Sequence, residues 1–151
     1  LSEPFDHLID MHKNIMCADL AKSFAGYYEK GKDKLTDILC EMIEFGQKVS
    51  AVDYNTAVDG QDLLNSGLNS VFDHYDFIIT PATTGEAPEG LGATGSPVFN
   101  TLATYCGTPA ITLPLMEGPN GLPLGVQVIG PRGDDARLLR NANWLMQRVL
   151  G

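Results

Sequence analysis

The chain has 151 residues, enough for a single domain that buries roughly 70% of the surface of its unfolded chain. Its apolar share of 44% and charged share of 19% exclude a disordered polypeptide. The formal net charge is −9, and no Lys or Arg occurs from Val49 to Pro131. That stretch lacks the cations of a nucleic-acid or polyphosphate site, so we expect an acidic surface that aids solubility.

Hydropathy and cysteine content indicate the compartment. No window has the 18 or more uninterrupted apolar residues of a spanning helix, and the first residues lack the pattern of a secretion signal. We therefore expect a soluble, cytoplasmic protein without a membrane partner. The three cysteines, Cys17, Cys40 and Cys106, are far apart and form no C-x-x-C motif. They are typical of reduced, small apolar residues, and a reactive thiol is the alternative.

Apolar spacing predicts three helices in the first half of the chain. The first covers Phe5 to Tyr28 with a break near 14–18, and the second covers 35–46. Ser50 followed by Asp53 predicts a capping box that begins the third helix. The inner face of this third helix is expected to carry Val52, Ala57, Leu64, Leu68, Val71, Phe72 and Tyr75.

The pattern changes at Asp76. The short apolar run 77–81, closed by Pro, predicts a buried strand, and the Gly- and Pro-rich stretch 82–95 predicts a loop. Ser96 as a cap, with Pro97 after it, predicts a helix over 97–106 that Gly107 closes.

Two more strands and a last helix complete the prediction. The segments 110–114 and 125–129 are strand-like, and the turn signal at 119–121 makes them a long-looped hairpin or neighbouring strands. The last helix begins at Asp134 or Asp135 and runs to Leu150. Three strands are few for a stable sheet, so more strands should come from elsewhere. No linker separates two domains, and 1–151 is expected to be one domain.

The order of four motifs identifies a family. They are Tyr75–Pro81, Phe99-Asn100, Gly107–Pro114 and Gly121–Pro131. Their order resembles the carboxy-terminal portion of amidase-signature hydrolases. The resemblance implies an α/β fold of helices packed on a mixed β-sheet, with this chain as a carboxy-terminal fragment. The amino-acid sequence from 89 to 100 is more similar to general amidases than to the amidotransferase subunits that transamidate glutamyl-tRNA.

The chemistry that the resemblance implies is acyl transfer without a cofactor. A Ser attacks a small amide, a second Ser in a cis peptide relays a proton, and a Lys acts as the base. The family carries this triad in its amino-terminal half, so we expect the catalytic residues to lie outside this chain and the chain alone to be inactive. Ser96 lacks the G-x-S-x-G elbow and is interpreted as a helix cap. We expect no metal site, because His7 and His12 are five residues apart and His74 stands alone.

Loops at strand ends commonly carry binding residues. The candidates for lining the acyl or leaving-group pocket are Thr80, Pro81, Ala82, Thr83 and Phe99, together with the loop 85–95. An ordinary surface loop is the alternative. Turn and packing roles explain the recurrent residues Asn100, Gly107, Pro109, Pro114, Gly121, Pro123 and Gly125.

The expected partners are a small-molecule amide and the remainder of the amidase chain, with no nucleic acid, and a homo-oligomer stays open. A non-catalytic binding or scaffold subunit, and an amidotransferase subunit of the same family, are the alternative functions.

Overall fold

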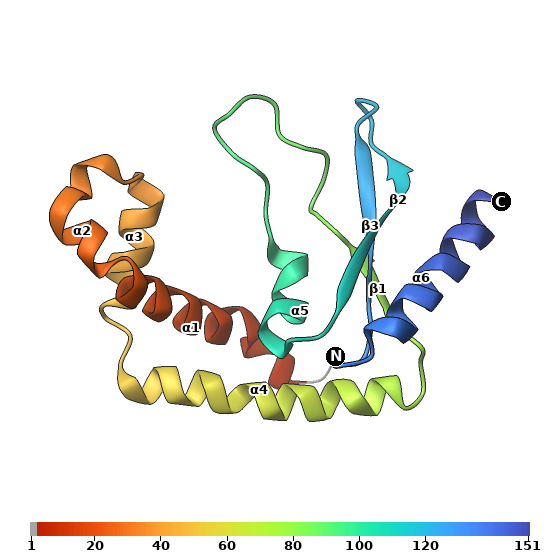
Figure 1. Ribbon diagram of the computed structural model, residues 1–151, viewed down its shortest axis with the longest axis horizontal. Helices are drawn as coiled ribbons and strands as arrows, with labels where there is room; N and C mark the ends of the chain where they lie inside the picture. The colour runs from red at the N-terminus through yellow and green to blue at the C-terminus, as the bar shows by residue number, and fades with distance from the viewer. Residues whose placement is uncertain (1–2) are drawn as a thin grey trace. The chain divides into compact units, whose positions relative to one another are not determined.

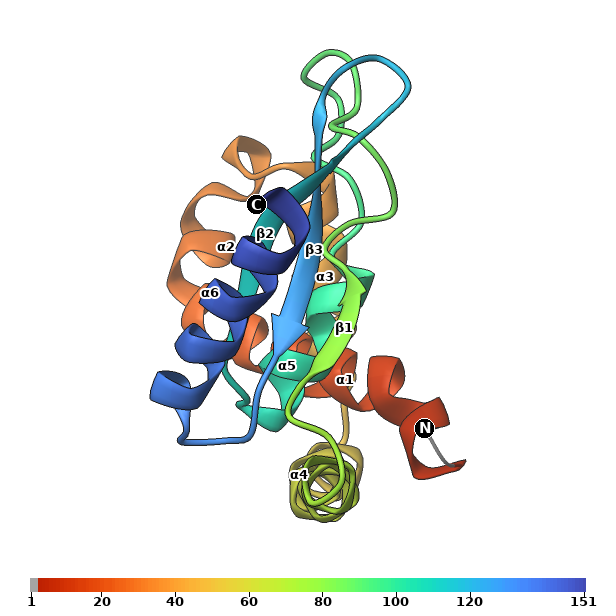
Figure 2. The ribbon, with the colours of Figure 1, turned by 90° about the vertical axis from the view of Figure 1, so that its right-hand side faces the viewer.

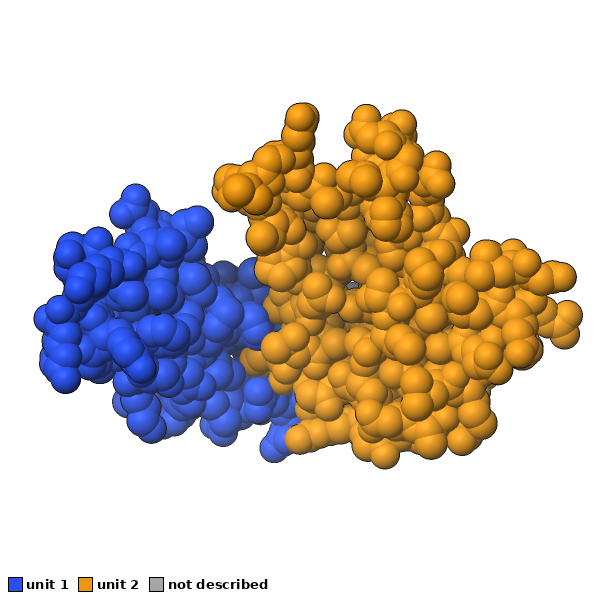
Figure 3. All heavy atoms as spheres, turned by 45° about the horizontal axis from the view of Figure 1, so that its top comes forward, with its two compact units in different colours: residues 1–63 blue, residues 64–151 orange. Residues whose placement is uncertain are grey.

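The computed structural model describes residues 3–151 (Figure 1). The chain divides into two compact units, Leu1–Leu63 and Leu64–Gly151 (Figure 3). The boundary falls inside the helix α4 (Ala51–Phe72), so no loop marks it. The prediction of one domain over 1–151 stays a prediction.

The first unit is helical, as predicted. Its elements are a 3₁₀ turn (Glu3–His7), α1 (Leu8–Ser23), α2 (Ala25–Gly31), a second 3₁₀ turn (Lys32–Lys34), α3 (Asp37–Gly46) and the beginning of α4. The predicted break near 14–18 is wrong, because α1 continues to Ser23 and the interruption lies at Phe24. Residues 14–18 contain no Gly or Pro, whereas Gly26 follows the observed interruption and is a poor helix former.

Close packing of α1 on α3 organises this unit. Cys17 and Ile43 are fully buried, and a Cβ at Gly46 would overlap the backbone carbonyl of Cys17. The predicted Ser50 cap of α4 is confirmed, because the Asp53 N–H donates to Ser50 Oγ over 3.0 Å. The returning contact comes from the Ser50 hydroxyl, which donates to Asp53 Oδ2 over 2.7 Å. Local chemistry therefore sets where α4 begins.

The second unit is a small α/β layer structure. Its elements after α4 are β1 (Ile78–Pro81), a 3₁₀ turn (Val98–Asn100), α5 (Thr101–Cys106), β2 (Ala110–Glu117), β3 (Pro123–Ile129) and α6 (Asp135–Leu150). The strand order is β1-β3-β2. The α/β class is confirmed. The mixed character expected of the sheet is not found in these three strands, because both pairings are antiparallel. β2 and β3 form a hairpin, and β1 runs opposite to β3.

Helices cover the two faces of this sheet. One face packs on α6 through Leu113, Val128, Leu138 and Ala142. The two ribbon views show α5 on the opposite face (Figures 1 and 2). Because successive strand residues point to opposite faces, Gln127 faces α5 where Val128 faces α6.

Three local predictions need correction. β1 is an edge strand with Ile79 53% exposed, because it pairs with β3 alone among the described strands. On the third predicted helix, Val52 and Tyr75 are 73% and 67% exposed, since the first lies in the opening turn and the second beyond the helix end. The helix predicted over 97–106 begins as a 3₁₀ turn before α5.

Other predictions for the second unit are confirmed. Gly107 closes α5 in the left-handed conformation, with φ 62°. Asp134 caps α6, where its Oδ1 accepts the Arg137 N–H over 3.2 Å. Within residues 3–151, no helix has both the length and the apolar character that crossing a membrane requires.

Candidate functional site

Gln127, in the middle of β3, joins two of the segments that the sequence singles out. Its side chain is almost completely buried, with 3% of the residue exposed. Gln127 Nε2 donates to Thr80 Oγ1 over 3.1 Å and to the carbonyl oxygen of Phe99 over 2.9 Å. One carboxamide thereby ties the end of β1 to the turn that precedes α5.

A row of polar residues crosses the sheet at this level. Thr80, Gln127 and Thr112 are register partners on β1, β3 and β2. A shallow depression of about 400 Å³ lies on the α5 face and is lined by Asn100, Ala103, Thr104, Thr108, Ala110, Thr112 and Gln127. None of these side chains is charged. The depression therefore offers hydroxyl and carboxamide groups, which suit a neutral hydrogen-bonding ligand.

The structure joins two of the five predicted site residues, Thr80 and Phe99, and the residues that line the depression include none of the five. Thr80 and Phe99 meet through Gln127, and the Ala82 N–H donates to the Gly125 carbonyl over 2.9 Å. Pro81 lies on the other face of β1 and is exposed, because side chains alternate along a strand. Thr83 lies where the loop 82–95 closes on itself: its Oγ1 is 3.8 Å from the position of a Cβ at Gly95.

Glu86 holds the middle of this loop. Its carboxylate accepts three N–H groups from the β2–β3 turn, two from Asn120 and one from Leu122. Partial burial acts to raise the pKa of the Glu86 carboxyl, but the hydrogen bonds from Asn120 and Leu122 outweigh it, so the pKa lies below its usual value. Glu86 is thus ionised at neutral pH.

Sequence reasoning missed both Gln127 and Glu86. Gln127 had a signal, because it is a lone carboxamide within the apolar run Val126 to Ile129. A polar side chain in a buried strand needs hydrogen-bond partners, and these lie in the two segments that were predicted to bind substrate. Glu86 had no such signal, since its partners lie 34 and 36 residues away.

The other candidate groups are placed as follows. Ser96 Oγ accepts the Val98 N–H over 3.4 Å, but the predicted cap needs correction, because the 3₁₀ turn begins at Val98 and its N-cap is Pro97. Burial raises the pKa of the Cys106 thiol to about 11, against a smaller opposing effect of Arg132, so the thiolate of a reactive cysteine is suppressed. In the described part of the chain, no three His, Cys, Asp or Glu side chains come together as a metal site.

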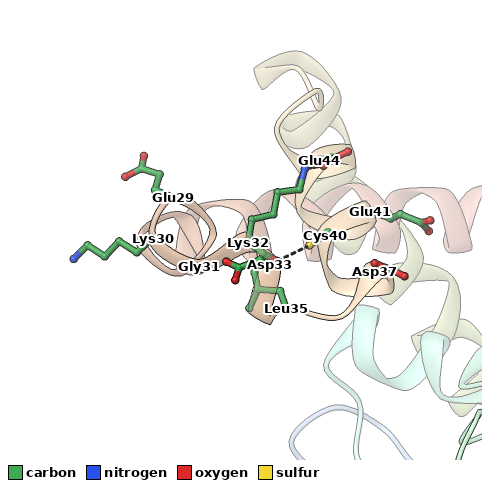
Figure 4. Close-up of a pocket in the computed structure, with 10 residues that line it drawn as sticks. All are labelled: Glu29, Lys30, Gly31, Lys32, Asp33, Leu35, Asp37, Cys40, Glu41 and Glu44. Atoms are coloured by element: carbon green, nitrogen blue, oxygen red, sulfur yellow. Dashed lines mark hydrogen bonds and ion pairs between the residues drawn. The ribbon is translucent and has the colours of Figure 1, made fainter.

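The helical unit has a depression of its own, of about 830 Å³, between α2 and α3 (Figure 4). Glu44 accepts the Lys32 ammonium over 2.7 Å and the Tyr28 hydroxyl over 2.6 Å. The hydrogen bond from Lys32, followed by that from Tyr28, lowers the pKa of Glu44. Glu29 and Lys30 extend away from the rest of the lining (Figure 4). The depression is open and charged, and Lys32 and Glu44 pair with each other there.

The profile of the family described as Amidase matches residues 2–139. AmiD of Mycobacterium tuberculosis is 32% identical over 147 residues, which cover 88% of this chain and 30% of AmiD. A glutamyl-tRNA(Gln) amidotransferase subunit of Salinibacter ruber is 31% identical over 148 residues, which cover 91% of this chain and 24% of that protein.

Solved structures agree in fold. The crystal structure of an amidase superposes with a TM-score of 0.80 at 19% identity and covers 99% of this chain and 37% of the amidase. The chain therefore spans a quarter to about a third of the length of the relatives it matches. That share agrees with the resemblance to one portion of the family fold. The protein belongs to the amidase family.

Proposed function

We propose that this chain is the carboxy-terminal, substrate-side portion of an amidase that hydrolyses the carbon–nitrogen bond of small amides. The Ser-cisSer-Lys groups that perform acyl transfer lie in polypeptide outside these 151 residues, and no cofactor takes part. The observation that supports the proposal is the Gln127 carboxamide, which lines the uncharged depression and donates hydrogen bonds to the predicted site residues Thr80 and Phe99.

The lining of the depression favours an uncharged substrate. Asn100, Thr108 and Thr112 contribute only neutral polar groups beside Gln127. Thr108 Oγ1 is buried without a hydrogen-bond partner within residues 3–151, and such groups usually gain one from a bound molecule or from another part of the protein. In this proposal Thr80, Pro81, Ala82, Thr83 and Phe99 line the acyl or leaving-group pocket, together with the loop 85–95.

A comparison of this chain with its full-length parent tests the proposal. Both are assayed against acetamide, butyramide and benzamide, and both are treated with a fluorophosphonate that labels activated serines. We expect the parent to release ammonia and to carry the label outside residues 1–151, while the chain alone shows neither. Turnover by the chain alone that survives Ser96→Ala would contradict the proposal, because the catalytic groups would then lie within it.

An amidotransferase subunit of the same family is the second candidate. The 31% identity with the Salinibacter protein over 91% of this chain favours it. The absence of Lys and Arg from 49 to 131 favours a small amide over tRNA. Glutamine as the preferred substrate of the parent, with little turnover of the simple amides, would select the amidotransferase.

A non-catalytic binding or scaffold subunit is the third candidate, and a parent without turnover or label would support it. The proposed partner is the remainder of the amidase chain, which would pair with the open edges of the sheet at β1 and β2. Light scattering tests whether the protein also associates with itself. We also propose that the protein acts in the cytoplasm, which the three free cysteines support.

A further inference from the structure

The turn between β2 and β3 forms a cradle that the Glu86 carboxylate fills. Oε1 accepts the Asn120 N–H over 2.9 Å and the Leu122 N–H over 3.2 Å, while Oε2 accepts Asn120 Nδ2 over 2.6 Å. Both carboxylate oxygens are therefore used. The donors lie 34 and 36 residues from Glu86, so this is a tertiary contact between the loop 82–95 and the hairpin.

The shape of the turn matches this carboxylate. The Gly118 N–H donates to the Leu122 carbonyl over 2.9 Å, and the Gly121 N–H donates to the Gly118 carbonyl over 3.0 Å, which closes the turn. A Cβ at Gly118 would overlap the carboxyl group of Glu86. Any other residue at 118 would therefore displace the carboxylate.

We propose that Glu86 is a positioning residue for the substrate side of the enzyme, a role that rests on the proposed function. Its carboxylate anchors the loop that begins at Ala82, two residues after the site residue Thr80, and that leads to Phe99. The two ends of this segment are fixed by Gln127, and the Glu86 contact fixes its middle. The loop then has one conformation, and the enzyme does not have to order it when substrate binds.

Two substitutions release the loop by different routes. Glu86→Gln keeps the shape of the side chain but leaves one accepting oxygen where the cradle uses two. Gly118→Ala keeps Glu86 and every donor and expels the carboxylate by overlap. The matched controls are Glu89→Gln, the same change in the same loop, and Gly85→Ala, where a Cβ would meet no atom within 4 Å.

Backbone NMR on this chain measures the release without reference to activity. Both test substitutions should speed amide exchange at Asn120 and Leu122 at least about tenfold, and they should lower the order parameters of 84–92 below about 0.6. Both controls should leave these values unchanged. Unchanged exchange and order in Glu86→Gln and Gly118→Ala would overturn the proposal.

Kinetics of the full-length parent separate positioning from mere structure. Because the loop must be ordered at each binding event, we expect KM for benzamide to rise about fivefold to tenfold in both variants, with kcat changed less than about twofold. An unchanged KM in variants whose loop is released would overturn the role of Glu86 while leaving the proposed function intact. A parent that hydrolyses no amide would instead contradict the proposed function, and the NMR result would still decide whether Glu86 orders the loop.

Discussion

Gln127→Met is the most direct test of how the candidate site is held together. Methionine has nearly the volume of glutamine, so packing is kept while the two N–H donations to Thr80 and Phe99 are lost. Each hydrogen bond contributes about 1 kcal/mol net, and the half-buried acceptors left behind add a smaller penalty. We expect the free energy of unfolding to fall by about 2 to 3 kcal/mol.

Urea unfolding of this chain, followed by far-ultraviolet circular dichroism, measures this loss. Gln147→Met makes the same chemical change at an exposed position of α6, and its free energy of unfolding should stay within about 0.5 kcal/mol of that of the unsubstituted chain. Thr80→Val removes one of the two acceptors and should cost about 1 kcal/mol, with a coupling of about 0.5 to 1.5 kcal/mol to Gln127→Met. A loss below about 0.5 kcal/mol in Gln127→Met would refute the central role of this carboxamide.

Further predictions concern the packing, capping and protonation of other groups. Gly46→Ala should destabilise the chain by about 3 kcal/mol in urea, because its Cβ overlaps the backbone of α1, whereas Gly26→Ala has open space and should be neutral or stabilising. Ser50→Ala should cost about 1 kcal/mol in the same assay through loss of the α4 cap. Cys106 should resist iodoacetamide at pH 8 until the chain unfolds, as read by mass spectrometry, because burial raises its pKa to about 11. The folded pKa of Glu86 lies below its unfolded value, so the contribution of its carboxylate to loop order is complete above the unfolded pKa. Loop order measured by NMR should be lost as the pH falls through the folded pKa.

Local chemistry explains which parts of the fold could be predicted from the sequence. The caps at Ser50 and Asp134 use donors only three residues away, and Gly107 ends α5 through its own backbone conformation. The hairpin of β2 and β3 follows from the turn residues between them. Each of these features depends on a few neighbouring residues, so a short window of sequence contains the whole cause.

Tertiary contacts explain which parts could not. The Gln127 side chain reaches Thr80 across 47 positions and Phe99 across 28, and no periodicity encodes such pairings. The sequence placed Thr80 and Phe99 in one candidate site because loops at strand ends commonly carry binding residues, without a physical link between the two. The exposed Val52 and Tyr75 fail for the related reason that a helical stripe predicts a direction, while burial depends on what packs there.

All the anchors of the loop 82–95 belong to one hairpin, and they differ in what they stabilise. Gln127 is buried and holds the segment 80–99 at both ends. Its loss leaves the acceptors at Thr80 and Phe99 without their donor in the folded state and so lowers global stability. The Glu86 contact divides a loop whose two ends are already held by Gln127. Because the entropy of loop closure changes only slowly with loop length, this division adds little to the free energy of unfolding. Glu86→Gln should therefore leave the urea midpoint of the chain nearly unchanged while it disorders the loop, whereas Gln127→Met should shift the midpoint clearly. Equal shifts of the midpoint in both variants would show that the Glu86 contact belongs to the cooperative core, and the division between a stabilising and a positioning contact would then be wrong.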